Sequence, residues 1–372
     1  SDEGTAVPDG SFERAEAARV RFSWRRGCRG HPDVPVGFVL LAEAGPTLSG
    51  SWVDASGTLA LAARAAADAQ VRVLEPSAIA LSALRHDLAG SERIRLEAGL
   101  PWDLAPASVD GLILAPPAER GSARVIAELD AAAFALRAEG ELLLLLHKDL
   151  GAKRYEKEAA RRFRDGGVVA RSGGARLSRW RGPVVAPSPP EPWISFEVDG
   201  RSVRALAGCH AAGKLDPGTA QLLRALADAG VPAREASVLD LGCGWGPLAR
   251  AAAERGARVV ALDDDLAAVR SCRVNVPEAH VMHADGSRAD GNERRFDVVL
   301  VNPPFHVGKA VRTELGRALL RRAAGATSAS GELWWVANRD LRYETDPLLA
   351  GATRRRDEGG FRVFRWSPRS DR

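Results

Sequence analysis

The chain has 372 residues, of which 45% are hydrophobic and 27% charged, a composition that excludes wholesale disorder and allows two domains with separate cores. Its apolar runs are far shorter than the roughly 20 residues of a membrane-spanning helix, and Ser1–Arg21 lacks the apolar segment of a secretory signal, so we expect a cytoplasmic protein that contacts no membrane. The formal charge of +4 is carried mostly by arginine, which fits an RNA partner, although the composition of a GC-rich genome explains it at least as well.

Along the chain, short runs rich in Val and Leu alternate with alanine-rich stretches. This pattern predicts strands and crossover helices around a mostly parallel sheet. The five prolines of residues 181–193 cannot continue a helix or a central strand, and they predict a linker. We therefore expect one domain over residues 1–180 and a second over residues 194–372.

The second half repeats the order of the first. The matching positions are Asp54 and Asp240, Glu75 and Asp263, Ala115 and Asn302, and the later strands that begin at Gly140 and Gly331, at offsets of 186, 188, 187 and 191 residues. Because the offsets hardly drift, we infer an internal duplication that gives two tandem Rossmann-like α/β domains.

A glycine loop follows the predicted buried strand Ser237–Leu241. Its glycines are Gly242, Gly244 and Gly246, and a helix is expected from Pro247. Glycines let the backbone turn tightly and approach a ligand closely. The GxGxG spacing differs from the GxGxxG of dinucleotide-binding proteins, so by itself the loop leaves both S-adenosylmethionine and a nicotinamide cofactor open.

Two acidic positions favour S-adenosylmethionine. Asp263, with Asp264 beside it, ends the next predicted strand, where a carboxylate can accept both hydroxyls of a ribose, although a helix cap explains these residues as well. Asp285, followed by Gly286, comes after another predicted strand and would reach an adenine amino group, although aspartate is also common in turns.

The segment Asn302-Pro303-Pro304-Phe305 follows the predicted strand Phe296–Val301 and indicates the reaction. The lone pair of an aromatic amine is delocalised into its ring and must be drawn out before the nitrogen can accept a methyl group. An Asn oxygen and a backbone carbonyl next to proline can each accept one N–H of the amine. The prolines hold the turn rigid, and Phe305 offers a face on which a base can stack. We therefore predict methyl transfer to an exocyclic amino nitrogen.

With these motifs, residues 195–366 resemble the class I methyltransferase domain of the bacterial ribosomal RNA small-subunit methyltransferase C and large-subunit methyltransferase G family, and the duplicated layout is similar too. The resemblance also rests on Leu206–Leu223, on the His306 that follows the turn, and on Gly359–Trp366. It implies a class I enzyme that uses S-adenosylmethionine to methylate guanine N2 in ribosomal RNA, with small-subunit (16S) RNA favoured over large-subunit RNA as the substrate.

The resemblance also implies roles for single residues. The methionine part of the cofactor would be held by Asp240 and the three loop glycines, the ribose by Asp263 and Asp264, the adenine by Asp285 and Gly286, and the guanine by Asn302 to Phe305. Lys214 and Asp216 are further expected cofactor contacts. His210-Ala211 stands just before them where the family often has Phe-Ser, which puts the contacts of this loop in doubt.

Other functions stay open at this point. The same turn occurs in adenine-N6 methyltransferases and, as NPPY, in enzymes that methylate glutamine in release factors. A non-catalytic RNA-binding assembly protein is a further alternative, whereas a nicotinamide oxidoreductase is disfavoured because nothing supplies a proton relay. The four cysteines stand far apart without a CxxC pair, so we expect no metal site, and we expect a monomer whose partner is ribosomal RNA or a ribosomal subunit.

The first copy is expected to be degenerate and non-catalytic. Asp54–Thr58 keeps one glycine, and Leu114–Ala118 keeps both prolines but has Ala in place of both Asn and Phe. We expect one cofactor per chain, bound in the second half. Basic stretches of both halves are expected to contact RNA phosphates, namely Lys148–Lys157, Arg161–Arg164, Arg339, Arg342 and Arg354–Arg356.

Overall fold

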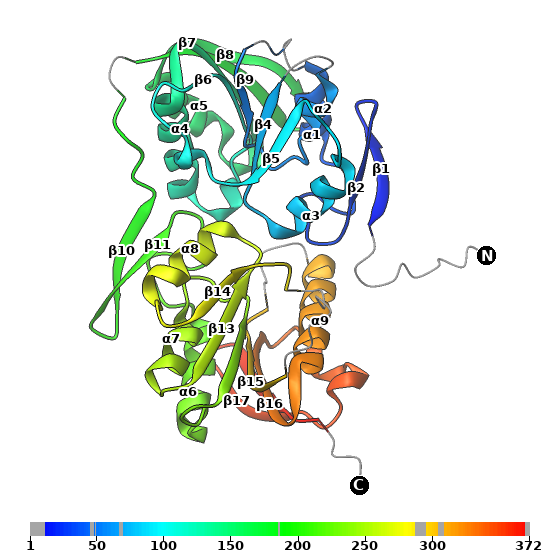
Figure 1. Cartoon of the computed structure of the whole chain (residues 1–372), viewed down its shortest axis with the longest axis vertical. Coiled ribbons are helices and arrows are strands. Elements are labelled where there is room, and N and C mark those ends of the chain that lie inside the picture. Colours follow the sequence, from blue (N-terminus) through cyan, green and yellow to red (C-terminus); the bar gives the residue numbers. More distant parts are fainter. Residues whose placement is uncertain are drawn as a thin grey trace, which may run out of the picture. The chain divides into compact units, whose positions relative to one another are not determined.

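The structure is a computed structural model that describes residues 12–44, 48, 50–66, 70–184, 187–286, 295–303 and 309–368. Contacts within the chain divide these residues into two units, one from Phe12 to Trp193 and the other from Ile194 onward. Figure 1 shows a sheet with helices packed against it in each unit.

In the described part of the first unit, a seven-stranded sheet has the order β5-β4-β3-β6-β7-β9-β8. The first five strands are parallel, β9 is antiparallel to β7, and β8 is antiparallel to β9. The strands are β3 (Trp52–Asp54), β4 (Val71–Glu75), β5 (Ile94–Ala98), β6 (Val109–Leu114), β7 (Leu136–His147), β8 (Phe163–Ser172) and β9 (Ala175–Pro183), after a hairpin of β1 (Glu13–Ala17) and β2 (Val20–Trp24). The helices are α1 (Val36–Ala44), α2 (Leu61–Ala65), α3 (Ala78–Asp87), α4 (Ser122–Ala135) and α5 (Ala152–Ala160).

The second unit has a sheet of the order β14-β13-β12-β15-β16-β18-β17 in its described residues. Its strands are β12 (Ser237–Leu241), β13 (Arg258–Asp263), β14 (His280–His283), β15 (Phe296–Val301), β16 (Thr327–Asn338), β17 (Thr353–Glu358) and β18 (Phe361–Trp366), after a hairpin of β10 (Trp193–Val198) and β11 (Arg201–Leu206). Its helices are α6 (Pro217–Ala229), α7 (Pro247–Glu254), α8 (Leu266–Asn275) and α9 (Lys309–Ala326).

Counted within each seven-stranded sheet, both sheets place their described strands in the order third, second, first, fourth, fifth, seventh, sixth. The expectation of two Rossmann-like α/β domains is therefore confirmed. Strand β9 ends at Pro183 and β10 begins at Trp193, so the predicted linker of residues 181–193 overlaps the end of one strand and the start of the other.

The core of the second unit lies on both faces of its sheet. Alternate side chains of β15 point to opposite faces, so that Val298 and Leu300 pack with α6, α7 and α8, whereas Val299 and Val301 pack with α9. Such burial on both faces explains why the strand is continuously hydrophobic. No helix among the described residues is long and apolar enough to cross a membrane.

Helix α6 begins and ends at residues suited to those positions. The Asp216 carboxylate caps it by accepting a hydrogen bond from the backbone N–H of Thr219 at 2.8 Å, Pro217 opens its first turn, and Gly230 ends it in the left-handed conformation. The start of α6 is therefore set at Asp216 and Pro217, which matters for the site below.

Candidate functional site

The predicted site residues of the second unit meet at one edge of its sheet. Strand β12 lies between β13 and β15 and is parallel to both, with Leu241 paired to Leu262 on one side and to Val301 on the other. The residues that follow these strands, the glycine loop, Asp263 and Asn302, therefore lie at the same carboxyl edge. This edge is where ligands bind in open α/β sheets.

The glycine loop has a backbone that other residues adopt only with strain. Gly242, Gly244 and Gly246 have φ of 84°, 56° and 95°. A Cβ atom on Gly246 would lie 2.9 Å from the Cys272 sulfur, whereas a Cβ on Gly242 or Gly244 would have nothing within 4 Å. Gly246 is thus required for packing, and the other two leave open space beside the loop that a ligand can fill.

Asp263 ties this loop to the next strand. Its carboxylate accepts hydrogen bonds from the backbone N–H groups of Gly244 and Asp265, both at 2.9 Å. Asp285 and Gly286 follow β14, which pairs with β13, and the N–H of Ala284 donates to the Asp263 carbonyl at 3.1 Å. The residues predicted to hold the ribose and the adenine are therefore neighbours.

Two carboxylates beside the loop have raised pKa values. Burial raises the pKa of Asp240, which is fully buried, to about 7, and the charge of Asp263 adds to the effect. Burial likewise raises the pKa of Asp263 to about 6. A positively charged ligand would offset the cost of ionising both groups. S-adenosylmethionine carries a sulfonium and an ammonium group, so the open loop and these carboxylates fit it.

Asn302 follows β15 and is held by two residues at the start of α6. Its side-chain nitrogen donates to the Asp216 carboxylate at 3.0 Å and to the Thr219 hydroxyl at 2.8 Å. Burial opposes the ionisation of Asp216, but hydrogen bonds from His210, Thr219 and Asn302 outweigh it and lower the Asp216 pKa to about 2. An ionised carboxylate can only accept hydrogen bonds, so the atom facing it must be the NH₂ group. The Asn302 oxygen is then the atom left to accept from a substrate.

The sequence reasoning did not identify Thr219. The signal was present in its spacing, since the first turn of a helix capped by Asp216 includes position 219. Asp216 was predicted as a cofactor contact, and the structure shows its contact with Asn302. Lys214 is exposed and lies two residues before Asp216. Pro303 is buried, whereas Pro304, Phe305 and His306 lie outside the described residues.

At the corresponding edge of the first unit, different side chains occupy the loop. Ser56 and Thr58 stand at the positions of Gly242 and Gly244, both are buried, and their hydroxyls are hydrogen-bonded to each other at 2.7 Å. The Ser56 hydroxyl also bonds to the Asp54 carboxylate. Leu59 and Ala60 have φ of 54° and 53°, the left-handed conformation that favours glycine.

Arg29 lies between this loop and the end of β6. Its guanidinium donates to the Ser56 carbonyl at 3.1 Å and to the carbonyl of Ala115, which stands at the position of Asn302. The Arg29 side chain also lies over the Phe38 ring, 5.7 Å from its centroid. In the first unit, a cationic side chain thus lies beside Ala115, the residue that corresponds to Asn302 of the second unit.

Many of the basic residues predicted to contact RNA form ion pairs within the protein. In the second unit, Arg339 and Arg354 pair with Asp357, and Arg356 pairs with Asp228 and Glu358. In the first unit, Arg161, Arg162 and Arg164 have acidic partners as well. Among the described residues, the exposed groups without an acidic partner include Lys148, Lys153, Lys157, Arg342 and Arg355.

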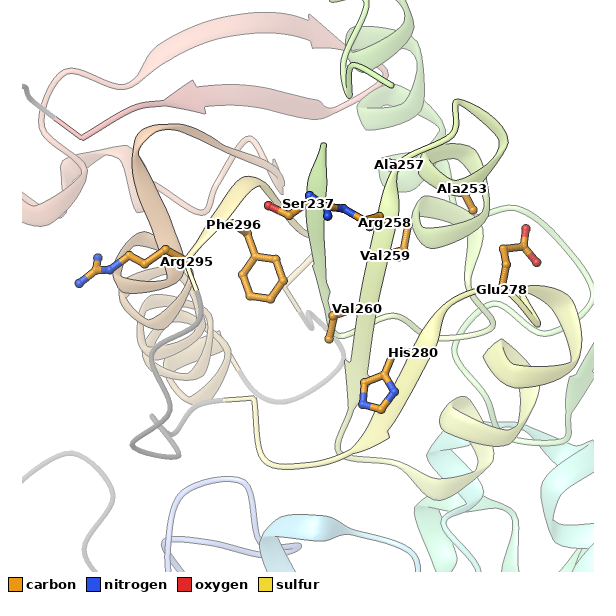
Figure 2. A pocket seen from close by; sticks show the side chains of 10 residues that line it. All are labelled: Ser237, Ala253, Ala257, Arg258, Val259, Val260, Glu278, His280, Arg295 and Phe296. Carbon is orange, nitrogen blue, oxygen red and sulfur yellow. The ribbon is translucent and has the colours of Figure 1, made fainter. Parts of the chain in front are cut away.

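A cavity of about 630 Å³ lies in the second unit, away from this edge, and Figure 2 shows the side chains that line it. It is lined by Ser237, Arg258, His280 and Phe296, which stand at the amino ends of β12 to β15. Because these strands are parallel, their amino ends lie at the edge opposite to the glycine loop. The cavity is therefore separate from the predicted site. Within the described residues, no cluster of His, Cys, Asp or Glu could hold a metal ion.

Comparisons with known proteins point to one family. The model of the methyltransferase small domain matches residues 200–365. Curated relatives named ribosomal RNA small subunit methyltransferase C are 37% identical over 181 residues in Pseudomonas putida (strain GB-1), which is 46% of this chain, and 35% identical over 186 residues in Chromohalobacter salexigens, which is 48% of it. These matches span about half of the length of the relatives, 52% and 55%.

A solved structure matches nearly the whole chain. It is titled as the T. thermophilus 16S rRNA N2 G1207 methyltransferase (RsmC) in complex with AdoMet and guanosine. The two chains are 33% identical with a TM-score of 0.84, and the match covers 96% of this chain and 98% of the other. The similarity therefore extends over both units.

Proposed function

This chain belongs to the ribosomal RNA small subunit methyltransferase C family, and we propose that it transfers the methyl group of S-adenosylmethionine to N2 of a guanine in 16S ribosomal RNA. The observation that carries the proposal is the fixed amide of Asn302, whose NH₂ group is bound to Asp216 and Thr219. Its oxygen is left to accept an N–H from the substrate amine. The whole-length relative solved with AdoMet and guanosine supports the choice of cofactor and base.

The proposed reaction depends mainly on orientation of the amine. When bound, S-adenosylmethionine supplies a methyl group on a positively charged sulfur. The Asn302 oxygen accepts one N–H of the guanine amine and a backbone carbonyl of the turn accepts the other, which directs the nitrogen lone pair toward the methyl carbon. As the N–C bond forms and the S–C bond breaks, a proton of the amine becomes acidic and passes to solvent. Phe305 is proposed to stack on the base, with Pro303 and Pro304 holding the turn rigid.

The cofactor contacts are proposed from the residues at the carboxyl edge. Asp240, Gly242, Gly244 and Gly246 would hold the methionine part, because the loop leaves open space and the carboxylate favours a cation. Asp263 and Asp264 would bind the ribose. Asp285 and Gly286 would bind the adenine, with Lys214 at the margin of the site.

We also propose that the first unit is a non-catalytic copy that binds RNA or supports the second unit, so that each chain, acting as a monomer, binds one cofactor. The buried hydroxyls of Ser56 and Thr58 support this proposal, because they fill the loop that stays open beside Gly242 and Gly244 in the second unit. Arg29 supports it too, since its guanidinium is bonded to the carbonyls of Ser56 and Ala115. Its exposed Lys148, Lys153 and Lys157 are available for phosphate contacts. The substrate places the proposed activity in the cytoplasm.

The experiment that tests the function separates the possible acceptors. The purified full chain is incubated with methyl-labelled S-adenosylmethionine and, in separate reactions, with unmodified small subunits, large subunits, DNA or a release factor. We expect label in 16S RNA, and mass mapping of its nucleotides should locate it as N2-methylguanine. Label in DNA or in the release factor would favour the adenine-N6 or glutamine alternative. RNA binding without label would favour a non-catalytic assembly protein.

A further inference from the structure

We propose that Asp216 and Thr219 are positioning residues that hold the Asn302 amide in the one orientation that offers its oxygen to the guanine amine. The inference deepens the proposed function and rests on it. Asp216, which caps α6, and Thr219, in the first turn of α6, would act on the reaction through Asn302, without touching the substrate.

The first argument is the chemistry of the two acceptors. An Asn side chain can rotate by about 180° and exchange its oxygen and nitrogen at little steric cost. Here the nitrogen faces both the Asp216 carboxylate and the Thr219 hydroxyl, at 3.0 and 2.8 Å. The rotated amide would place its oxygen against an ionised carboxylate and would lose both hydrogen bonds. It would also present NH₂ to an amine that needs an acceptor.

The second argument is the rigidity of the acceptors. Asp216 and Thr219 are 6% and 4% exposed. One oxygen of Asp216 accepts from the Thr219 N–H at 2.8 Å and from Asn302, and the other lies 3.4 Å from the His210 ring nitrogen. The carboxylate thus caps α6 and binds Asn302 at the same time. The cap therefore sets the place of the carboxylate before any substrate arrives.

The third argument is the first unit, where the whole arrangement is replaced. Helices α1 and α6 begin at Val36 and Pro217, 181 residues apart, and the pairs Gly27-Cys28 and Gly208-Cys209 keep the same offset. By this offset His210, Asp216 and Thr219 correspond to Arg29, Pro35 and Phe38. Asn302 corresponds to Ala115 at the later offset of 187 residues. Neither Pro35 nor Phe38 can accept a side-chain hydrogen bond. The unit that lacks the Asn therefore also lacks both groups that would orient it.

The test uses paired substitutions in the full chain. Thr219→Val keeps the shape of the side chain and removes the acceptor, and Thr219→Ser keeps the hydroxyl. Asp216→Ser can still cap the helix but is too short to replace the carboxylate at Asn302. We expect Thr219→Val and Asp216→Ser to lower kcat by up to about 10²-fold, the effect of misplacing a catalytic group by about 1 Å, while the Kd for S-adenosylmethionine in Thr219→Val stays at the parent value. Thr219→Ser, which keeps the hydroxyl, should retain most of the parent kcat.

A matched control separates positioning from loss of stability. Ser77 caps α3 in the first unit through the N–H of Ala80, and Ser77→Ala removes a helix cap that makes no hydrogen bond to Asn302. If turnover follows stability alone, Ser77→Ala should reduce kcat as much as Thr219→Val does at the same change in Tm. Parent-like kcat in Thr219→Val and Asp216→Ser, together with an inactive Asn302→Ala, would overturn the inference while leaving the proposed function in place.

A second readout does not depend on methyl transfer. The ¹⁵N-resolved side-chain amide signals of Asn302, identified by their loss in Asn302→Ala, report its hydrogen bonds directly. We expect both amide protons to be protected from exchange in the parent and to lose that protection in Thr219→Val and Asp216→Ser. If the parent fails to methylate guanine, the proposed function is wrong, and unchanged amide signals in both variants would show separately that the positioning role is wrong.

Discussion

The two units have the same strand order and differ at the carboxyl edges of their sheets. Each buries an aspartate at the end of its first sheet strand, Asp54 in one and Asp240 in the other, and burial raises the pKa of both. The unit proposed to be non-catalytic thus keeps a buried carboxylate at this position, so part of the role of this carboxylate is structural. The difference lies in the loop and the turn, where Ser56, Thr58 and Ala115 replace two glycines and Asn302.

In both units, the fold and the proposed chemistry depend on different residues. The fold depends on dozens of buried apolar side chains on both faces of each sheet, and these remain in both units. The proposed chemistry depends on a few groups at the carboxyl edge, namely the open loop at Gly242 and Gly244 and the oxygen of Asn302, whose NH₂ group is already bonded. Replacing them closes the loop around internal hydrogen bonds, such as that between Ser56 and Thr58, without disturbing the core.

The largest effect is expected from the residue that most distinguishes the two turns. Asn302→Ala removes the acceptor for the amine and should lower kcat by about 10² to 10³, the usual loss for one preorganised polar group, while cofactor affinity is kept. Ala115→Asn restores the residue type in the first unit and should add no activity, because Pro35 and Phe38 cannot orient it. Turnover unchanged in Asn302→Ala would remove that residue from the mechanism.

The next effect concerns the cofactor. Asp263→Ala removes the carboxylate proposed to accept the ribose hydroxyls and now bonded to the Gly244 N–H, so S-adenosylmethionine should bind much more weakly. Glu75 ends the corresponding strand of the first unit, and Glu75→Gln should leave the affinity unchanged. Calorimetry on the full chain checks both expectations and the stoichiometry of one. Two cofactors per chain, or parent affinity in Asp263→Ala, would contradict the proposed difference between the units.

A smaller effect is a pH dependence that both units share. The pKa of Asp240 rises from an ordinary 3.8 to about 7 on folding, so its contribution to stability is present below about pH 4 and is lost as the pH rises to about 7. Asp240→Asn should remove this loss of stability with rising pH. Burial also raises the pKa of Asp54, so Asp54→Asn should reduce the corresponding loss in the first unit. Thermal unfolding at several pH values measures both effects. Only Asp240→Asn should alter the affinity for S-adenosylmethionine, whereas an equal change in Asp54→Asn would mean that both units bind it.

The smallest effects are expected from single basic residues. Lys153 and Lys157 are exposed on α5 without an acidic partner among the described residues, whereas Arg161 is paired with Glu158. Lys153→Ala and Lys157→Ala should each weaken RNA binding and reduce the slope of log K against log salt concentration by about one. Arg161→Ala should change both the affinity and the slope less. Binding measured at several salt concentrations checks this. An equal loss in all three variants would mean that internal ion pairs do not keep arginines from RNA.

The sequence by itself determined the two α/β domains and the positions of the glycine loop, Asp263 and Asn302. Local patterns suffice for these, because strands, glycine turns and proline turns are set by neighbouring residues, and parallel strands bring their carboxyl ends to one edge. The repeated spacing also identified residues that differ between the two halves, such as Ala115 at the position of Asn302.

Only the tertiary structure placed Asn302 against Asp216 and Thr219, which precede it by 86 and 83 residues, and paired Arg356 with Asp228 across 128 residues. No periodicity in the sequence reports such contacts, because they depend on the order of strands in the sheet and on where a helix begins relative to it. Likewise, only the structure showed that Arg29 lies against the carbonyls of Ser56 and Ala115. An arginine read from the sequence is a charge available to RNA, and whether it is already bound within the protein is decided by the fold around it.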